Sequence, residues 1–208
     1  MKNNTTIFKL ILSLFLCSLL ITGCLGKDRF DNSAIRYQMV EIPDYEISDY
    51  EDLLASENDV AKYNAICNLI KYAWDYAGIL KKATTKNPDS KEKMPAKEEI
   101  EKANKVLSDI FTGLTDENEN IKAASLIFLT EFSLNYSDKD MLYKQVEKVK
   151  AYSLRTQYEH IRALAILSNS ETKIDKNLIE TYLDSKSWLV ANMTYLFLGK
   201  ISCEEFHK

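Results

Sequence analysis

The side chains best suited to acid–base or metal chemistry are sparse in this chain. Its 208 residues include two histidines, His160 and His207. A transition-metal site needs several ligands at short spacing, and neither histidine has a His-x-x-x-His or Cys-x-x-Cys partner. We therefore expect both histidines to be surface residues, and we predict no metal site and no cofactor.

One acidic segment, Asp116 to Asn120, has the alternating oxygen ligands with which an EF-hand calcium loop begins. Ile121 occupies the position that needs glycine in such a loop, and Ile127 the position that needs a bidentate glutamate. Carboxylates and amides at this place suit a helix start, where they meet unpaired backbone amides and the positive end of the helix dipole. We expect helix capping here rather than calcium binding.

The sequence lacks the motifs of common catalytic centres. It has no Gly-x-Ser-x-Gly elbow, no P-loop and no Gly-x-Gly-x-x-Gly, and only 5 glycines from which a phosphate-binding loop could be built. No cluster of serine, histidine and acid can be argued from their spacing. We predict that the protein is not an enzyme, and a hydrolase with an unrecognised site is the less favoured alternative.

The first two dozen residues have the organisation of a secretory leader. Lys2 and Lys9 precede or open an apolar run that extends from Leu10 to Ile21. This run is about twelve residues long, whereas roughly twenty are needed to cross a bilayer as a helix. We expect residues 1–23 to be a signal peptide rather than a membrane span.

The end of the apolar run, Ile21-Thr22-Gly23-Cys24, resembles the lipobox of bacterial lipoproteins. The resemblance implies cleavage between Gly23 and Cys24, attachment of diacylglycerol to the Cys24 thiol, and acylation of the new amino terminus. Two or three acyl chains anchor a protein stably, because each buried methylene contributes about 0.8 kcal/mol. We expect a protein tethered in the bacterial cell envelope, on the periplasmic face or the cell surface. An ordinary secretory signal with an incidental cysteine is the alternative.

Composition favours one helical domain. Hydrophobic residues make up 46% of the chain and charged residues 28%, with only 5 glycines and 3 prolines. The formal net charge of -4 and the lack of a basic stripe argue against a nucleic-acid partner. We expect Cys67 and Cys203 to be buried or idle thiols, so the stability of the domain has to come from apolar burial.

Apolar residues recur every three or four positions along most of the remaining chain, which predicts amphipathic helices. Residues 24–45 lack this period and are expected to form a flexible tether, whereas residues 46–208 are expected to form the helical domain. Short connections make neighbouring helices antiparallel. The expected helices are 47–55, 58–82, Pro95 to about Gly113, 117–135, 139–152, 157–168, 175–183 and 187–201, with a loop at 83–95.

The second helix of each successive pair carries a similar pattern. An apolar residue followed by a basic one is succeeded by a small residue one turn later and by leucine two turns later. The apolar-basic pairs are Ala61-Lys62, Ile121-Lys122, Ile161-Arg162 and Val190-Ala191. The small residues one turn later are Ala65, Ser125, Ala165 and Thr194, and the residues two turns later are Leu69, Leu129, Asn169 and Leu198. This pattern is similar to the HEAT repeat, although Ala191 and Asn169 depart from it. The anchors lie about 43 residues apart on average, close to the 40 to 47 of HEAT and armadillo units.

We therefore expect an all-α fold of antiparallel helical hairpins stacked as a short HEAT-like solenoid, and a non-repeating helical bundle is the alternative. Large aromatic residues on the second helices are candidates for a peptide-binding groove, although residues of this kind more often belong to the core. In a HEAT-like stack the basic residues Lys62, Lys122 and Arg162 form a row that pairs with acids of neighbouring repeats. The aromatic candidates are Tyr72, Trp74, Tyr76, Trp188 and Tyr195.

These observations lead to one functional hypothesis and two alternatives. We expect a lipid-anchored envelope lipoprotein that serves as a scaffold for a protein or peptide partner. The first alternative is an accessory factor for the assembly or maturation of other envelope proteins. The second, less favoured, is the hydrolase with an unrecognised site.

Overall fold

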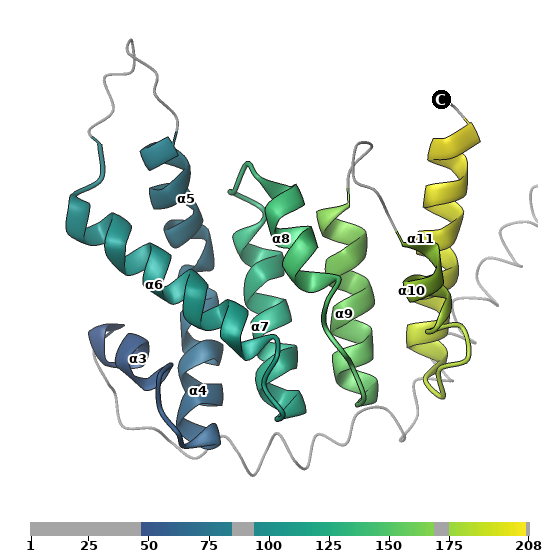
Figure 1. Cartoon of the computed structure of the whole chain (residues 1–208), viewed down its shortest axis with the longest axis horizontal. Helices are drawn as coiled ribbons and strands as arrows, with labels where there is room; N and C mark the ends of the chain where they lie inside the picture. Colours follow the sequence, from purple (N-terminus) through teal and green to yellow (C-terminus); the bar gives the residue numbers. More distant parts are fainter. Residues whose placement is uncertain (1–46, 85–93, 169–174, 207–208) are drawn as a thin grey trace, which may run out of the picture. The chain divides into compact units, whose positions relative to one another are not determined.

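The computed structural model describes residues 47–84, 94–168 and 175–206 (Figure 1). The regular structure within these ranges is entirely helical, which confirms the all-α fold class. The elements are α3 (Ile47–Leu53), α4 (Asp59–Leu69), the 3-10 helix η1 (Ile70–Tyr72), α5 (Ala73–Thr84), α6 (Lys97–Gly113), α7 (Glu119–Phe132), α8 (Lys139–Val146), α9 (Leu154–Leu167), α10 (Lys176–Glu180) and α11 (Trp188–Phe206).

Several of the predictions concern residues outside the described ranges. These are the leader of residues 1–23 with Gly23 and Cys24, the tether of residues 24–45, most of the loop at 83–95, Asn169 and His207. The side chain of Cys203 also lies outside the description. None of the described helices is long and apolar enough to cross a membrane.

The helices predicted as second members of pairs pack against one another in order. α4 contacts α7, α7 contacts α9, and α9 contacts α11; Figure 1 shows these helices side by side. Their partners α3, α6, α8 and α10 pack against α4, α7, α9 and α11 respectively. The core lies between these two sets of helices. The choice between a HEAT-like repeat and a non-repeating bundle stays a prediction.

The apolar and small positions of the predicted pattern lie on the buried side of these helices. The residues at the first position in α7, α9 and α11 are fully buried, as are the small residues of α4, α7 and α11. Ala165 is half-buried and packs against the core. The fully buried residues are Ile121, Ile161, Val190, Ala65, Ser125 and Thr194. The helical period therefore predicted the buried face correctly.

The single helix predicted for residues 58–82 is wrong, because η1 divides it into α4 and α5. Just before the tighter turn, Asn68 Nδ2 donates a hydrogen bond to the Asn64 carbonyl at 2.9 Å. Side-chain hydrogen bonds of this kind compete with the regular backbone ladder and accompany local changes of helix geometry. The next predicted start is also shifted: Pro95 lies before α6, and Ala96 is the N-cap.

The helix predicted for residues 139–152 ends early, at Val146. The backbone amides of Tyr152 and Ser153 donate instead to the Glu119 carboxylate, at 2.9 and 2.8 Å. Ser153 then caps α9, its side chain accepting from the Thr156 amide. A carboxylate from another helix therefore takes the amides that a longer helix would have used.

Candidate functional site

The five aromatic residues predicted to contact a partner lie on two parts of the fold. Trp74 on α5 is exposed, as are Trp188 and Tyr195 on α11, whereas Tyr72 is half-buried and Tyr76 is buried. α5 packs against α6 and α7, and α11 packs against α9 and α10. The exposed aromatics therefore form two surfaces rather than one groove.

Tyr76 is a correction to the predicted surface. Its hydroxyl donates a hydrogen bond to the Glu51 carboxylate, which also pairs with Lys102 at 2.9 Å. Burial, reinforced by the hydrogen bond and the charge of Glu51, raises the pKa of Tyr76 well above its usual value. The side chain links α3 to α5 from inside the core. Tyr76 is therefore a core residue and not part of a partner-binding surface.

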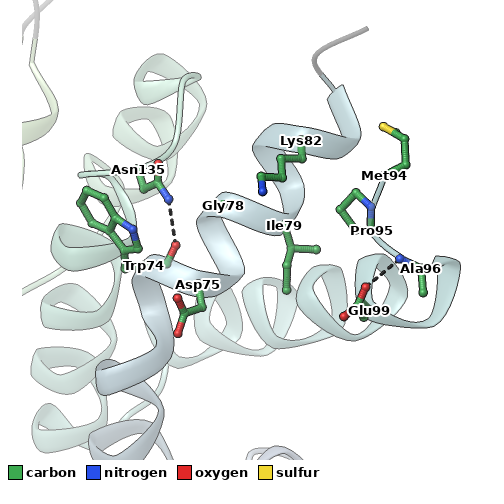
Figure 2. Close-up of a pocket in the computed structure, with 10 residues that line it drawn as sticks. All are labelled: Trp74, Asp75, Gly78, Ile79, Lys82, Met94, Pro95, Ala96, Glu99 and Asn135. Atoms are coloured by element: carbon green, nitrogen blue, oxygen red, sulfur yellow. Dashed lines mark hydrogen bonds between the residues drawn. The ribbon is translucent and has the colours of Figure 1, made fainter. Parts of the chain in front are cut away.

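Trp74 lines an open pocket of about 680 Å³ between α5, the start of α6 and the segment after α7 (Figure 2). Figure 2 shows the indole on the side of Asn135, with Met94 and Pro95 across the pocket. The lining residues are Trp74, Asp75, Gly78, Ile79, Lys82, Met94, Pro95, Ala96, Glu99 and Asn135.

The backbone of α5 is held close to the segment that follows α7. Asn135 Nδ2 donates a hydrogen bond to the Trp74 carbonyl at 3.2 Å. A Cβ atom on Gly78 would lie only 3.0 Å from the same Asn135 nitrogen, so glycine permits this approach. The contact fixes the wall from which the Trp74 side chain, 51% exposed, projects.

Charged side chains line the pocket together with the apolar ones. Asp75 and Lys82 come from α5, and Glu99 comes from the first turn of α6. The Glu99 carboxylate accepts a hydrogen bond from the Ala96 amide at 2.7 Å and so closes the start of α6. The lining contains no histidine, cysteine or serine. The pocket is therefore suited to hold an apolar side chain and a neighbouring charge by contact.

The acidic segment before α7 acts in helix capping and in an ion pair. Asn118 is the N-cap of α7, its side chain accepting from the Asn120 amide, and Asp116 accepts from the Asn118 amide at 2.9 Å. Asp116 also pairs with Lys62 at 3.0 Å. Among the residues that the structure describes, no group of three or more His, Cys, Asp or Glu side chains could hold a metal. The expected capping role is confirmed.

The predicted basic row is engaged with carboxylates. Lys62 of α4 reaches Asp116, which lies just before α7. Arg162 of α9 lies 3.1 Å from Glu159 on its own helix and 3.6 Å from Glu131 on α7. The first and last members of the row therefore pair with acids on neighbouring elements.

Lys122, the middle residue of the row, is buried between α7 and the segment before α9. Its Nζ atom lies 2.7 Å from Glu119 and donates to the Lys150 carbonyl at 3.2 Å. The same Glu119 carboxylate accepts the Tyr152 and Ser153 amides. Burial would raise the pKa of Glu119, but these hydrogen bonds from Lys122 and the backbone lower it. Lys122 and Glu119 thus join α7 to α9.

His160 contradicts the prediction of a surface histidine, because it is fully buried. Its Nε2 atom lies 2.8 Å from the Val146 carbonyl, and its Nδ1 atom is hydrogen-bonded to the Tyr182 hydroxyl. A carbonyl only accepts, so Nε2 carries the proton and Nδ1 accepts from tyrosine. Burial lowers the pKa of His160 to about 4. The neutral ring therefore links α9 to the end of α8 and to the turn after α10.

A signal for this burial was present in the sequence. His160 is followed at spacings of three and four by Ala163, Leu164 and Leu167, all of which are fully buried. The partner, Tyr182, is 22 residues away on another element. Its role depends on packing that the spacing of residues does not encode.

No family model, no curated protein and no solved structure matches this chain. The Trp74 pocket is the place where a residue predicted to bind a partner lines a described cavity.

Proposed function

We propose that this protein is a lipid-anchored scaffold of the bacterial cell envelope that binds a protein or peptide partner. The lipobox-like segment ending at Cys24 supports the anchor, and the sequence motifs supply no catalytic set. The ordered contacts of α4, α7, α9 and α11 support a HEAT-like arrangement. Such a stack offers long surfaces on which a partner segment can lie.

The Trp74 pocket is the observation that carries this proposal. The indole is 51% exposed in a pocket whose lining also includes the apolar side chains of Ile79, Met94 and Pro95. Covering the exposed half of a tryptophan removes roughly 120 Å² from water, which is worth about 3 kcal/mol before the costs of association. Tryptophan in a concave site is also the residue type that most often dominates binding energy.

The chemistry of the pocket indicates the kind of segment that fits. An apolar side chain of the partner enters the pocket between Trp74 and Met94, the two large apolar side chains at its opposite ends. A basic residue next to it faces Asp75 on the exposed first turn of α5. We propose a partner segment that contains an apolar anchor followed by a cation.

The test is selection of binders from a random peptide library displayed on phage, with the full chain as the target. Trp74→Ala should weaken binding of the selected peptides roughly 10- to 100-fold. Tyr152→Ala is the matched control, because Tyr152 is an exposed aromatic outside the pocket.

Fluorescence supplies a direct measure of contact with the pocket. The chain has two tryptophans, so Trp188→Phe leaves Trp74 as the single indole reporter. Bound peptide should shift the Trp74 emission to shorter wavelength, and peptides with a basic residue should bind less tightly at high salt. Selected peptides that bind Trp74→Ala and the unchanged chain equally would overturn the proposal.

A further inference from the structure

Helix α11 has one buried face and, opposite it, an exposed face whose residues carry no charge. The buried face consists of Val190, Thr194, Phe197 and Ile201, each at most 4% exposed. On the opposite face Trp188 is 61%, Tyr195 62% and Leu196 70% exposed. At 100° per residue, Ala191, Asn192, Gly199, Ser202 and Cys203 fall on this face as well. We call residues 188, 191, 192, 195, 196, 199, 202 and 203 the α11 outer face.

Other helices of the fold expose a different kind of surface. α6 presents charged residues to water and buries an apolar stripe. The exposed charged residues of α6 are Lys97, Glu98, Glu99, Glu101, Lys102 and Lys105. A helix that is apolar on both sides is normally covered on both. The α11 outer face is therefore a surface built for contact.

At Gly199 the α11 outer face has no side chain, which leaves a recess in the surface. The other described glycines, Gly78 and Gly113, each allow a close neighbour: an added Cβ would lie 3.0 Å from Asn135 and 2.3 Å from Ser125. A Cβ on Gly199 would meet nothing within 4 Å. Glycine inside a helix costs about 1 kcal/mol relative to alanine, and at Gly199 nothing in the described fold uses the space. A second helix that approaches here would use it.

We infer that the α11 outer face is a homodimer interface, in which α11 of one copy crosses α11 of a second copy at Gly199. In a two-fold interface the same patch of both copies is in contact, so the patch has to contain both projecting side chains and a recess that receives them. Tyr195 and Leu196 project beside the receding Gly199, so each copy supplies both parts. The residues of the face carry no charge and the exposed Lys200 lies at its edge, so a second identical face can meet it without burying a charge.

The exposed area is of the size that a dimer needs. Trp188, Tyr195 and Leu196 together leave roughly 400 Å² in water, given the usual areas of these side chains. A standard interface buries about 800 Å² on each partner. These three residues thus supply about half of that area, and the smaller residues of the face and the flanking turn can add to it.

The first experiment measures mass. The full chain is expressed in a bacterium, extracted in mild detergent and followed by sedimentation velocity with the detergent density-matched. We expect a dimer whose dissociation constant rises at least about 100-fold in Leu196→Glu, because the interface would then bury unpaired charge. Leu134→Glu is the matched control, since Leu134 is also an exposed leucine but belongs to the segment after α7, and its dimer should be unchanged.

The second experiment tests the crossing point in intact membranes. In Gly199→Cys made in a Cys203→Ser background, the two new thiols should lie close enough for oxidation to give a disulfide-linked dimer on a non-reducing gel. Ser108→Cys, on the exposed charged side of α6, and the parent chain, both with Cys203→Ser, are the controls and should give none. A dimer seen by cross-linking or by mass, and lost in Leu196→Glu, supports the interface.

Two results would overturn this inference. One is a chain that is monomeric by mass and forms no Gly199→Cys cross-link above the Ser108→Cys control. That outcome would assign the α11 outer face to a different protein or to another segment of the same chain. The other is a dimer that Leu196→Glu leaves intact, which would place the contact elsewhere.

Discussion

Gly113 at the end of α6 lies directly over Ser125 of α7. A Cβ atom on Gly113 would be 2.3 Å from Ser125 Oγ and 3.5 Å from Ser125 Cβ. The Ser125 hydroxyl is buried and has no hydrogen-bond partner in the described structure. Two small residues thus set the distance between the paired helices, and the serine oxygen fills the closest point of contact.

Gly113→Ala should destabilise the fold by about 1 to 3 kcal/mol, because the new methyl group collides with Ser125 Oγ. Ser125→Ala removes that oxygen and leaves an ordinary contact to Cβ at 3.5 Å. The double variant should therefore regain most of the lost stability. Urea unfolding of the four chains measures the coupling; additive effects of the two substitutions would show that the contact is not tight.

Glu119→Ala should destabilise the protein by about 2 kcal/mol at neutral pH. The change leaves buried Lys122 and the Tyr152 and Ser153 amides without their shared acceptor. Because the pKa of Glu119 is lowered in the fold, its contribution is present at neutral pH and is lost as the pH falls below 4.5, the value of an unperturbed glutamate. The difference in unfolding free energy from the unchanged chain should shrink toward pH 3.

The exposed neighbour Glu117 supplies the control for that experiment. Glu117→Ala removes the same charge from the same helix start without touching Lys122. It should change stability by less than about 0.5 kcal/mol. An equal loss in the two variants would argue for a general charge effect instead of the Glu119 network.

Protonation of His160 should destabilise the fold in mild acid. Burial lowers its pKa to about 4, against 6.5 for the free side chain, so the unfolded chain binds the proton first as the pH falls. The unfolding free energy should drop by roughly 1 to 2 kcal/mol between pH 6.5 and 5. His160→Phe should be less stable at pH 7, since Val146 and Tyr182 lose their partner, but should show a flatter dependence in this window. An equally steep profile in the variant would assign the effect to other groups.

Cys24→Ala should release the protein from the membrane fraction. The expected acyl chains are attached at this residue, and without them the described helices offer no membrane span. Incorporation of a palmitate analogue, followed by fractionation of cells, measures both modification and location. Cys67→Ala is the control, because Cys67 is a half-buried free thiol of the helical domain. Unchanged labelling and fractionation of Cys24→Ala would remove the anchor from the proposed function.

Particular residues show how far the sequence predicted the candidate site. Trp74 was a predicted contact residue, but its neighbours Met94, Glu99 and Asn135 come from segments that no local pattern connects to it. The same reasoning grouped Tyr76 with Trp74, and Tyr76 proved to be buried against Glu51. Two aromatics only two positions apart on a helix point in different directions, and neighbouring helices decide which of them is covered.

The sequence by itself determined the helical fold class and the buried face of the helices. Spacings of three and four residues, as in Ile121, Ser125 and Leu129, place side chains on one side of any α-helix, and burying that side is the main driving force of folding. These are local properties, so a linear pattern is enough to predict them.

Only the tertiary structure decided which polar residues enter the core and where helices end. His160 is buried with its ring satisfied by Val146 and Tyr182, and the residues expected to end the α8 helix instead donate their amides to Glu119 of α7. In both cases the deciding group comes from another element of the fold. Most buried polar side chains and backbone amides have a hydrogen-bond partner, and when that partner belongs to another element, only packing brings the two together.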